Sequence, residues 1–239
     1  MRRTGIDKKT AGLSREWLAA GLAGIAAWVQ ASPSGLNNTP TADTCPEQTA
    51  VFQTWEGFGG GDSENWIGVK YGLFKNAEIG TDWRTSGSPY LEPQFQAKYG
   101  VDIGEALPRL CVGIANLSAS TGRNGDPMPY GVLTYSLKDW CRLHAGYGFQ
   151  NNNEGAFGGI DRTFKVAGMN LMLCGDVIQS DERENALMAP GIKIGPATDD
   201  MQGIAGKILR HIVFETWTTF DTNGDADTYV AKLNLIVGF

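Results

Sequence analysis

The chain has 239 residues, of which 42% are hydrophobic, 10% aromatic and 19% charged, with a formal net charge of -6. The acidic balance excludes most nucleic-acid binding, which needs a basic surface. A helical membrane protein is also excluded, because each span needs about 20 consecutive apolar residues and the sequence contains no such run. Composition alone favours a secreted β-sandwich or soluble barrel. A membrane β-barrel also fits, since its lipid-facing residues alternate with polar ones and its mean hydropathy stays low.

The N-terminus has the features of an export signal. Five basic residues lie among the first fifteen, and an apolar run from Trp17 to Val29 follows them. Val29-Gln30-Ala31 places small or β-branched residues at the two positions that a signal peptidase reads. The run is too short to span a bilayer. We therefore predict a cleaved signal peptide at residues 1–31, the alternative being an amphipathic surface helix.

Residues 32–49 are rich in Pro, Thr, Asn and Ser and have no periodicity. They predict a periplasmic N-terminal segment ahead of a β-barrel domain at residues 50–239. From residue 50 onward, apolar and polar residues alternate in runs of about ten. The clearest run is Leu91 to Ile103, where every second residue is apolar and the residues between them are polar, charged or Gly.

About twelve such runs can be counted, an even number as in bacterial single-chain barrels. They lie near 50–58, 65–74, 77–85, 91–103, 109–119, 128–137, 140–150, 156–164, 166–179, 186–194, 207–220 and 228–239. Tight turns such as Lys75-Asn76 alternate with longer polar loops. One connection, Gly195 to Gly206, is long where a tight turn is expected, which leaves ten strands as an alternative.

The four cysteines, Cys45, Cys111, Cys141 and Cys174, form no C-x-x-C pair, so a zinc site is not predicted. We interpret them as small apolar core residues. A Cys111–Cys141 or Cys141–Cys174 disulfide is the lesser alternative, because export permits disulfides.

The polar face of the strands predicts the lining of a lumen. Its members are Lys70, Glu78, Asp82, Gln94, Gln96, Lys98, Arg142, His144, Asp161, Asp176 and Glu215. Hydrogen-bonding groups and charges of both signs suit a narrow aqueous pore or a binding lumen. They suit equally a salt-bridged interior that is closed. Interior glycines leave space and favour the pore.

Enzymatic activity and metal binding have weaker signals. Only His144 and His211 are present, and no G-x-S-x-G or H-E-x-x-H motif occurs, so we predict no catalytic residues. A loop with oxygens at alternate positions, Asp221, Asn223, Asp225 and Asp227, resembles a calcium loop. It lacks the Gly at position six and the Glu at position twelve, and a hairpin needing Asn-Gly explains it equally well. No cofactor is predicted.

The last run, Thr228 to Phe239, is apolar on one face to its final residue, an aromatic. Soluble domains rarely end this way, because termini usually fray into water. The ending resembles the C-terminal signature of Gram-negative outer-membrane β-barrels, with Leu233, Leu235, Val237 and Phe239 on the lipid side. Lys232 matches its polar position, and Asn234 stands where Gly is usual. The resemblance implies an outer-membrane location and recognition by the barrel assembly machinery.

A second resemblance lies in residues 35–42, Gly-Leu-Asn-Asn-Thr-Pro-Thr-Ala. This stretch is similar to the Gly-Leu-x-x-x-Pro-[Ser/Thr]-Ala segment of YjbH-type outer-membrane proteins, which are associated with exopolysaccharide operons. It supports an outer-membrane β protein and says little about cargo. A disordered linker is the alternative interpretation.

Together these features predict an all-β, antiparallel up-and-down transmembrane β-barrel of about 12 strands in the outer membrane. The expected function is passage or binding of small polar solutes, with lipid, the assembly machinery and such a solute as partners and no nucleic acid. The alternatives are a structural barrel with a closed lumen and a soluble secreted β protein. Aromatics at strand ends, such as Trp66, Trp140 and Tyr229, predict two girdles at the membrane surfaces.

Overall fold

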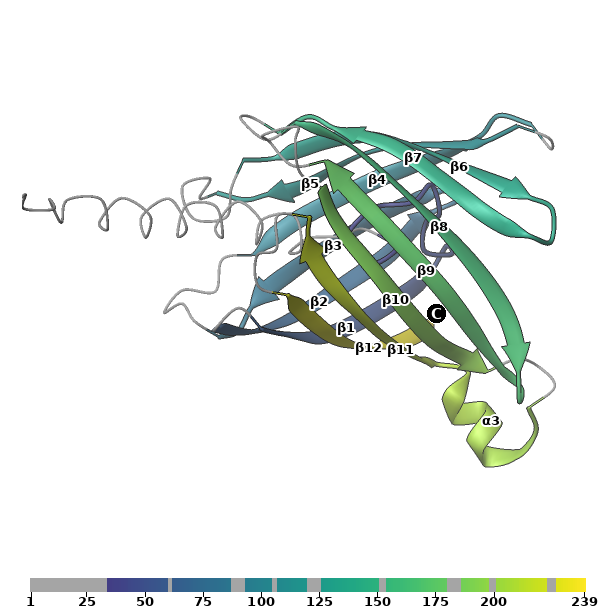
Figure 1. Cartoon of the computed structure of the whole chain (residues 1–239). Helices are drawn as coiled ribbons and strands as arrows, with labels where there is room; N and C mark the ends of the chain where they lie inside the picture. The colour runs from purple at the N-terminus through teal and green to yellow at the C-terminus, as the bar shows by residue number, and fades with distance from the viewer. Residues whose placement is uncertain are drawn as a thin grey trace, which may run out of the picture.

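The computed structural model (Figure 1) describes residues 34–59, 62–86, 93–104, 107–119, 126–150, 154–179, 186–197, 201–222 and 227–239. The predicted signal peptide lies outside the described residues. The strands are β1 (Thr49–Gly59), β2 (Asp62–Phe74), β3 (Ala77–Arg84), β4 (Gln94–Asp102), β5 (Arg109–Leu117), β6 (Met128–Leu137), β7 (Cys141–Gly148), β8 (Gly155–Val166), β9 (Met169–Gln179), β10 (Ala186–Ala197), β11 (Ile212–Asp221) and β12 (Thr228–Gly238). A short helix, α3 (Gly203–Leu209), lies between β10 and β11.

The strands form a closed antiparallel barrel in which neighbours in sequence are neighbours in space. The first strand closes the barrel against the last, with Thr49 opposite Gly238 and Gly59 opposite Thr228. Closure pairs the backbone of every strand on both sides and leaves no open sheet edge. The predicted all-β class and the count of twelve strands are confirmed, and the ten-strand alternative is wrong.

Strict alternation explains why each segment is a two-sided strand. In β4, Gln94, Gln96 and Lys98 are buried, while Phe95 and Tyr99, which point the other way, are about half exposed. Successive side chains of a strand point to opposite faces, so one face of the wall is polar and turned inward. The other face is apolar and turned outward.

The outward face is a broad apolar surface. Its half-exposed side chains include Phe52, Ile67, Ile79, Phe95, Val112, Leu133, Leu143, Ile160, Leu173, Ile192, Phe214, Leu233 and Leu235. A soluble protein would bury Ile67, Phe95 and Leu235 in a core, whereas here each side chain is about half exposed on the outer face, which contradicts the soluble alternative. Apolar residues around the whole outside and paired backbone throughout are the requirements for a transmembrane barrel. Within the described residues, no helix is both long and apolar enough to cross a membrane.

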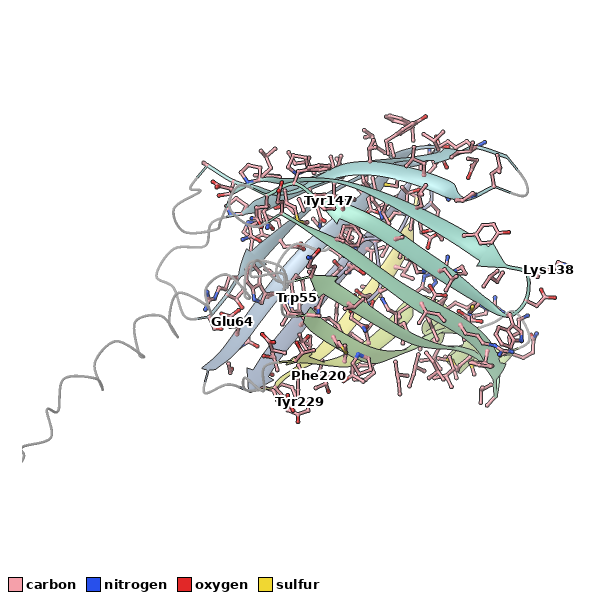
Figure 2. All side chains as sticks on the ribbon, turned by 45° about the horizontal axis from the view of Figure 1, so that its top comes forward. Trp55, Glu64, Lys138, Tyr147, Phe220 and Tyr229 are labelled. Carbon is pink, nitrogen blue, oxygen red and sulfur yellow. The ribbon has the colours of Figure 1, made fainter. Side chains whose placement is uncertain are left out.

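The two ends of the barrel differ. One end, here the turn end, holds both barrel termini and tight connections such as Lys75-Asn76, where Asn76 has a φ of 68° as the predicted hairpin turn requires. The other, the loop end, holds the longer connections. Figure 2 shows side chains on both faces of the wall, with Glu64 near the loop end and Lys138 at the turn end. The long connection after Gly195 contains α3, which lies at the turn end outside the wall (Figure 1).

Three details differ from the sequence-based expectation. The regular strand within the Leu91 to Ile103 run is β4, from Gln94 to Asp102. Trp66 lies inside the barrel, 4% exposed and stacked on Trp55 at 5.8 Å between ring centroids, because its position in β2 shares the inward face with Lys70. It is therefore not part of a girdle. All four cysteines are free, so both candidate disulfides are wrong.

The lipid-facing assignment makes a quantitative prediction for Leu133, near the middle of β6. Leu133→Arg should lower the free energy of unfolding by about 2–4 kcal/mol in lipid vesicles, because a charge then lies at the depth of the bilayer midplane. Tyr229→Arg, at the end of β12, should cost about 0–1 kcal/mol because it lies near the membrane surface. Urea titration of both variants measures the difference. Equal costs would contradict this orientation in the bilayer.

Candidate functional site in the barrel lumen

The polar side chains predicted to line the lumen lie on the inward face. Lys70, Glu78, Asp82, Gln94, Gln96, Lys98, His144, Asp161, Asp176 and Glu215 are each no more than 8% exposed, and Arg142 is partly exposed. They come from seven neighbouring and facing strands, and they are brought together through the lumen. Their contribution to solute passage is a proposal developed below.

An inserted segment shares the lumen with these side chains. Residues 34–45, the luminal hairpin, fold back on themselves, with Gly35 bridged to Pro40 and the Leu36 amide donating to the Thr39 carbonyl at 3.0 Å. The segment is the purple trace inside the barrel in Figure 1, leading into β1 from the turn end. Its residues from Leu36 to Ala42 are all buried.

Two carboxylates of the wall accept hydrogen bonds from the hairpin. Asp176 Oδ2 accepts from the Asn38 amide at 2.7 Å, the Thr39 amide at 2.8 Å and Thr39 Oγ1 at 3.0 Å. Glu78 accepts from the Ser34 amide at 3.0 Å, Ser34 Oγ at 2.6 Å and the Cys45 amide at 2.7 Å. Charge-assisted hydrogen bonds of this kind are stronger than neutral ones. Asp176 thus holds the tip of the hairpin, and Glu78 holds its two ends.

Two lysines of the wall bind the hairpin's carbonyl groups. Lys98 Nζ donates to the Ser34 carbonyl at 2.6 Å and to the Thr41 carbonyl at 3.2 Å. Lys193 Nζ donates to the Gly35 carbonyl at 2.8 Å and the Leu36 carbonyl at 2.9 Å. Backbone groups buried away from water must find partners, and charged wall residues supply them here.

The tip of the hairpin fits against the strands opposite. Asn38 Nδ2 donates to Thr219 Oγ1 at 2.9 Å, and Trp217 Nε1 donates to Asn38 Oδ1 at 3.1 Å. Two wall glycines make room for it: a Cβ at Gly159 would lie 2.2 Å from Leu36 Cδ1, and one at Gly191 would lie 2.5 Å from the Asn37 side-chain oxygen. Part of the space that glycines leave in this lumen is therefore filled by the hairpin.

A second ionic network, which contains His144, also contacts the hairpin through the Arg142–Asp43 ion pair at 2.7 Å. Arg142 makes a two-point contact with Asp161, at 3.0 Å from Nε and 2.8 Å from Nη2, and His144 Nε2 lies 2.9 Å from Asp161 Oδ2. His144 Nδ1 lies 2.9 Å from Thr134 Oγ1, and that hydroxyl accepts the Ala42 amide at 2.9 Å. A hydroxyl, an imidazole and a carboxylate in series suggest a nucleophile. Here the Thr134 hydroxyl oxygen accepts a hydrogen bond from the hairpin backbone. The three side chains therefore attach the hairpin to the barrel wall.

The calcium candidate is only partly covered by the structure. Asn223 and Asp225 lie outside the described residues, so the loop's geometry adds nothing to that prediction. Among the residues the structure describes, no group of three or more His, Cys, Asp or Glu side chains is arranged to hold a metal ion.

Some of the important residues were absent from the sequence-based set. Lys193 and the hairpin residues Asn38 and Thr39 make direct hydrogen bonds in the lumen. The signal for Lys193 is its alternation with Ile192 and Ile194 in β10. The hairpin has no periodicity, and its one signal is the Gly-Leu-x-x-x-Pro-Thr-Ala pattern.

The buried position of Cys45 makes the hairpin testable by thiol chemistry. Burial, and then the nearby Glu78 carboxylate, raises the pKa of the Cys45 thiol to about 11. The thiolate is the reactive form, so a variant retaining only Cys45 should react with maleimide much more slowly when folded than in urea at pH 8. Adding Asp176→Ala, which frees the hairpin tip, should raise the folded-state rate. Equal rates with and without urea would contradict a buried Cys45.

Comparison with known proteins gives the fold a precedent. No family model matches the chain, and no curated protein matches it. Among solved structures, a KdgM porin is 10% identical to this chain. The match covers 77% of this chain and 98% of the porin chain, with a TM-score of 0.56. A KdgM porin in complex with disordered oligogalacturonate has a TM-score of 0.55 over the same shares and at the same identity. The Acinetobacter baumannii outer membrane protein Omp33 is 8% identical, with a TM-score of 0.47 over 81% of this chain. The two KdgM structures establish that this chain shares the barrel fold of outer-membrane porins.

Proposed function

We propose that this chain is an outer-membrane channel that passes small polar solutes through a lumen narrowed by the luminal hairpin. The observation that carries the proposal is a lipid-facing barrel whose polar interior still contains open space. At the turn end, a cavity of about 820 Å³ is lined by charged residues that include Asp102, Arg109, Lys138 and Arg142. A second cavity of about 170 Å³ lies beside the hairpin.

The expected pore is narrow for two reasons. Barrels of about eight strands fill with side chains, and open aqueous channels need about 16–18, so twelve strands lie between these limits. The hairpin then occupies part of the remaining cross-section. Open space lined by charges of both signs suits small, hydrated, polar molecules. The KdgM porin complex, which holds oligogalacturonate, supports this reading as a similar fold with a polar solute.

The location follows from the wall and the final strand. Leu233 and Leu235 face outward and are about half exposed, and Phe239 is 76% exposed. These side chains suit the lipid side of the barrel, together with Val237. We infer that the barrel assembly machinery reads this strand during insertion into the outer membrane. The turn end, which carries both barrel termini, then faces the periplasm.

Swelling of proteoliposomes tests the proposal. Vesicles containing the purified full chain should swell in glycine or glucose and much more slowly in a trisaccharide. The controls are empty vesicles and vesicles made with heat-unfolded protein. Planar-bilayer recordings of the same sample should give discrete conductance steps. No swelling and no steps would overturn the channel proposal and favour the closed, structural barrel.

A further inference from the structure

We propose that the cavity of about 170 Å³ beside the luminal hairpin is a binding subsite for a small organic carboxylate. The subsite would give the lumen a preference for anionic solutes. This inference deepens the proposed function, and it rests on that function for its transport consequence. Binding itself can be measured without transport.

Lysines dominate the charge of the cavity. Lys70, Lys193 and Lys232 line it from three different strands, and Glu215 is the only carboxylate among its lining residues. Lys193 Nζ lies 2.9 Å from Glu215 Oε2, so one lysine is neutralised. The ammonium groups of Lys70 and Lys232 then outnumber the carboxylates among the described lining residues, and the lining carries a net positive charge.

Neither of these two lysines has a carboxylate within 4.0 Å among the described residues, although Asp82 and Glu215 act on both at longer range. Lys70 is 4% exposed and makes no hydrogen bond or ion pair with a described residue. Lys232 Nζ lies 5.0 Å from the centroid of the Trp55 ring and within 4.0 Å of no carboxylate among the described residues. A buried ammonium with no counter-charge in direct contact is costly. A bound carboxylate would supply such a contact to both lysines.

The rest of the lining selects the chemical class. Val51, Val213 and Ile236 give the cavity apolar walls. An organic carboxylate has both a charge for the lysines and carbon atoms for these walls. Chloride or phosphate, which are hydrated all round, would leave the apolar surface unused. The volume limits the ligand to a few carbon atoms.

The groups around the lysines are held in place. Gln53 Nε2 donates to Asn234 Oδ1 at 2.7 Å, and Asn234 Nδ2 donates to Glu215 Oε1 at 2.6 Å. This series of hydrogen bonds fixes the Glu215 carboxylate beside Lys193. The hairpin forms the remaining wall through Ser34, Gly35 and Leu36. A rigid lining of this kind is preorganised for binding.

The experiment measures malonate binding to the detergent-solubilised full chain by calorimetry. The wild type should bind malonate saturably, and Lys70→Gln/Lys232→Gln should bind at least tenfold more weakly. The matched control is Lys75→Gln/Lys165→Gln, which removes two exposed lysines and should bind as the wild type does. Heat-modifiable migration checks that each variant is folded. Lys70→Met alone, which keeps the side-chain length, should also weaken binding if the double variant fails to fold.

Reversal potentials under a sodium malonate gradient give the second readout. The wild type should favour the anion, and the double variant should lose that preference while keeping its conductance steps. Malonate binding without any conductance would overturn the channel proposal and leave the subsite standing. Conductance with no malonate binding, or with an ion preference unchanged in the double variant, would overturn the subsite.

Discussion

Replacing residues 35–41 with a Gly-Ser stretch of equal length is expected to raise the single-channel conductance several-fold. The reason is that the luminal hairpin fills space that the twelve-stranded wall would otherwise leave open, and a wider aqueous cross-section carries more current. The replacement removes the Asn38 side chain, which bonds Thr219 and Trp217, and the Leu36 side chain, which fits against Gly159. The backbone groups that bond Asp176, Lys98 and Lys193 remain, but in a flexible Gly-Ser stretch they are no longer held in one arrangement against the wall. Planar-bilayer recordings measure the change directly.

A conservative substitution in the same segment serves as the control. Thr39→Ser keeps the amide and hydroxyl donors to Asp176, so its conductance should match that of the wild type. The exclusion limit in liposome swelling should rise only in the Gly-Ser variant. An unchanged conductance and exclusion limit in that variant would mean that the hairpin does not narrow the path.

The second large effect is expected at Asp176. Asp176→Ala should lower the free energy of unfolding by about 3 kcal/mol or more, because three donors lose a charged acceptor and two of them are buried backbone amides. Asp176→Asn keeps a neutral oxygen acceptor and should cost less. Urea titration in lipid vesicles gives both values, and the temperature at which unboiled protein loses its compact migration gives an independent ranking.

The matched control is Asp139→Ala, which removes a carboxylate from an exposed turn between β6 and β7. It should change stability by less than about 0.5 kcal/mol, as surface substitutions usually do. Asp176→Ala should also produce brief openings to a higher conductance, since the hairpin tip is released. The anchoring role of Asp176 is refuted if its Ala variant is no less stable than the Asp139→Ala control.

The barrel could be predicted from sequence because its strands follow a local pattern of alternating apolar and polar residues. Period-two alternation depends on nearest neighbours, so β4 and the Lys75-Asn76 turn could be read without knowing their partners. The same rule placed Lys98 and Asp176 on the inward face. It also placed Trp66 inside, and only the expectation of a girdle at strand ends assigned it to the outside.

The luminal hairpin could not be predicted from period-two alternation. Its residues have no periodicity, and Asn38 and Thr39 bind Asp176, which lies 137 or more positions away in sequence. The structure now gives physical reasons for the small residues of its motif. A Cβ at Gly35 would lie 2.2 Å from the Thr39 carbonyl oxygen, and Ala42 is fully buried in the interior cluster with Cys111 and Val132. The free cysteines follow the same logic, because Cys111 fills space inside the lumen and faces no second thiol.

Heat-modifiable migration of the full chain, extracted from membranes in mild detergent, tests whether the closed barrel spans a membrane. We predict that the protein is found in the membrane fraction and that the unboiled sample migrates faster than the boiled one, since the closed ladder from β1 to β12 stays compact in detergent. Protein in the soluble fraction, with identical migration before and after boiling, would show that the chain does not form a membrane-spanning barrel.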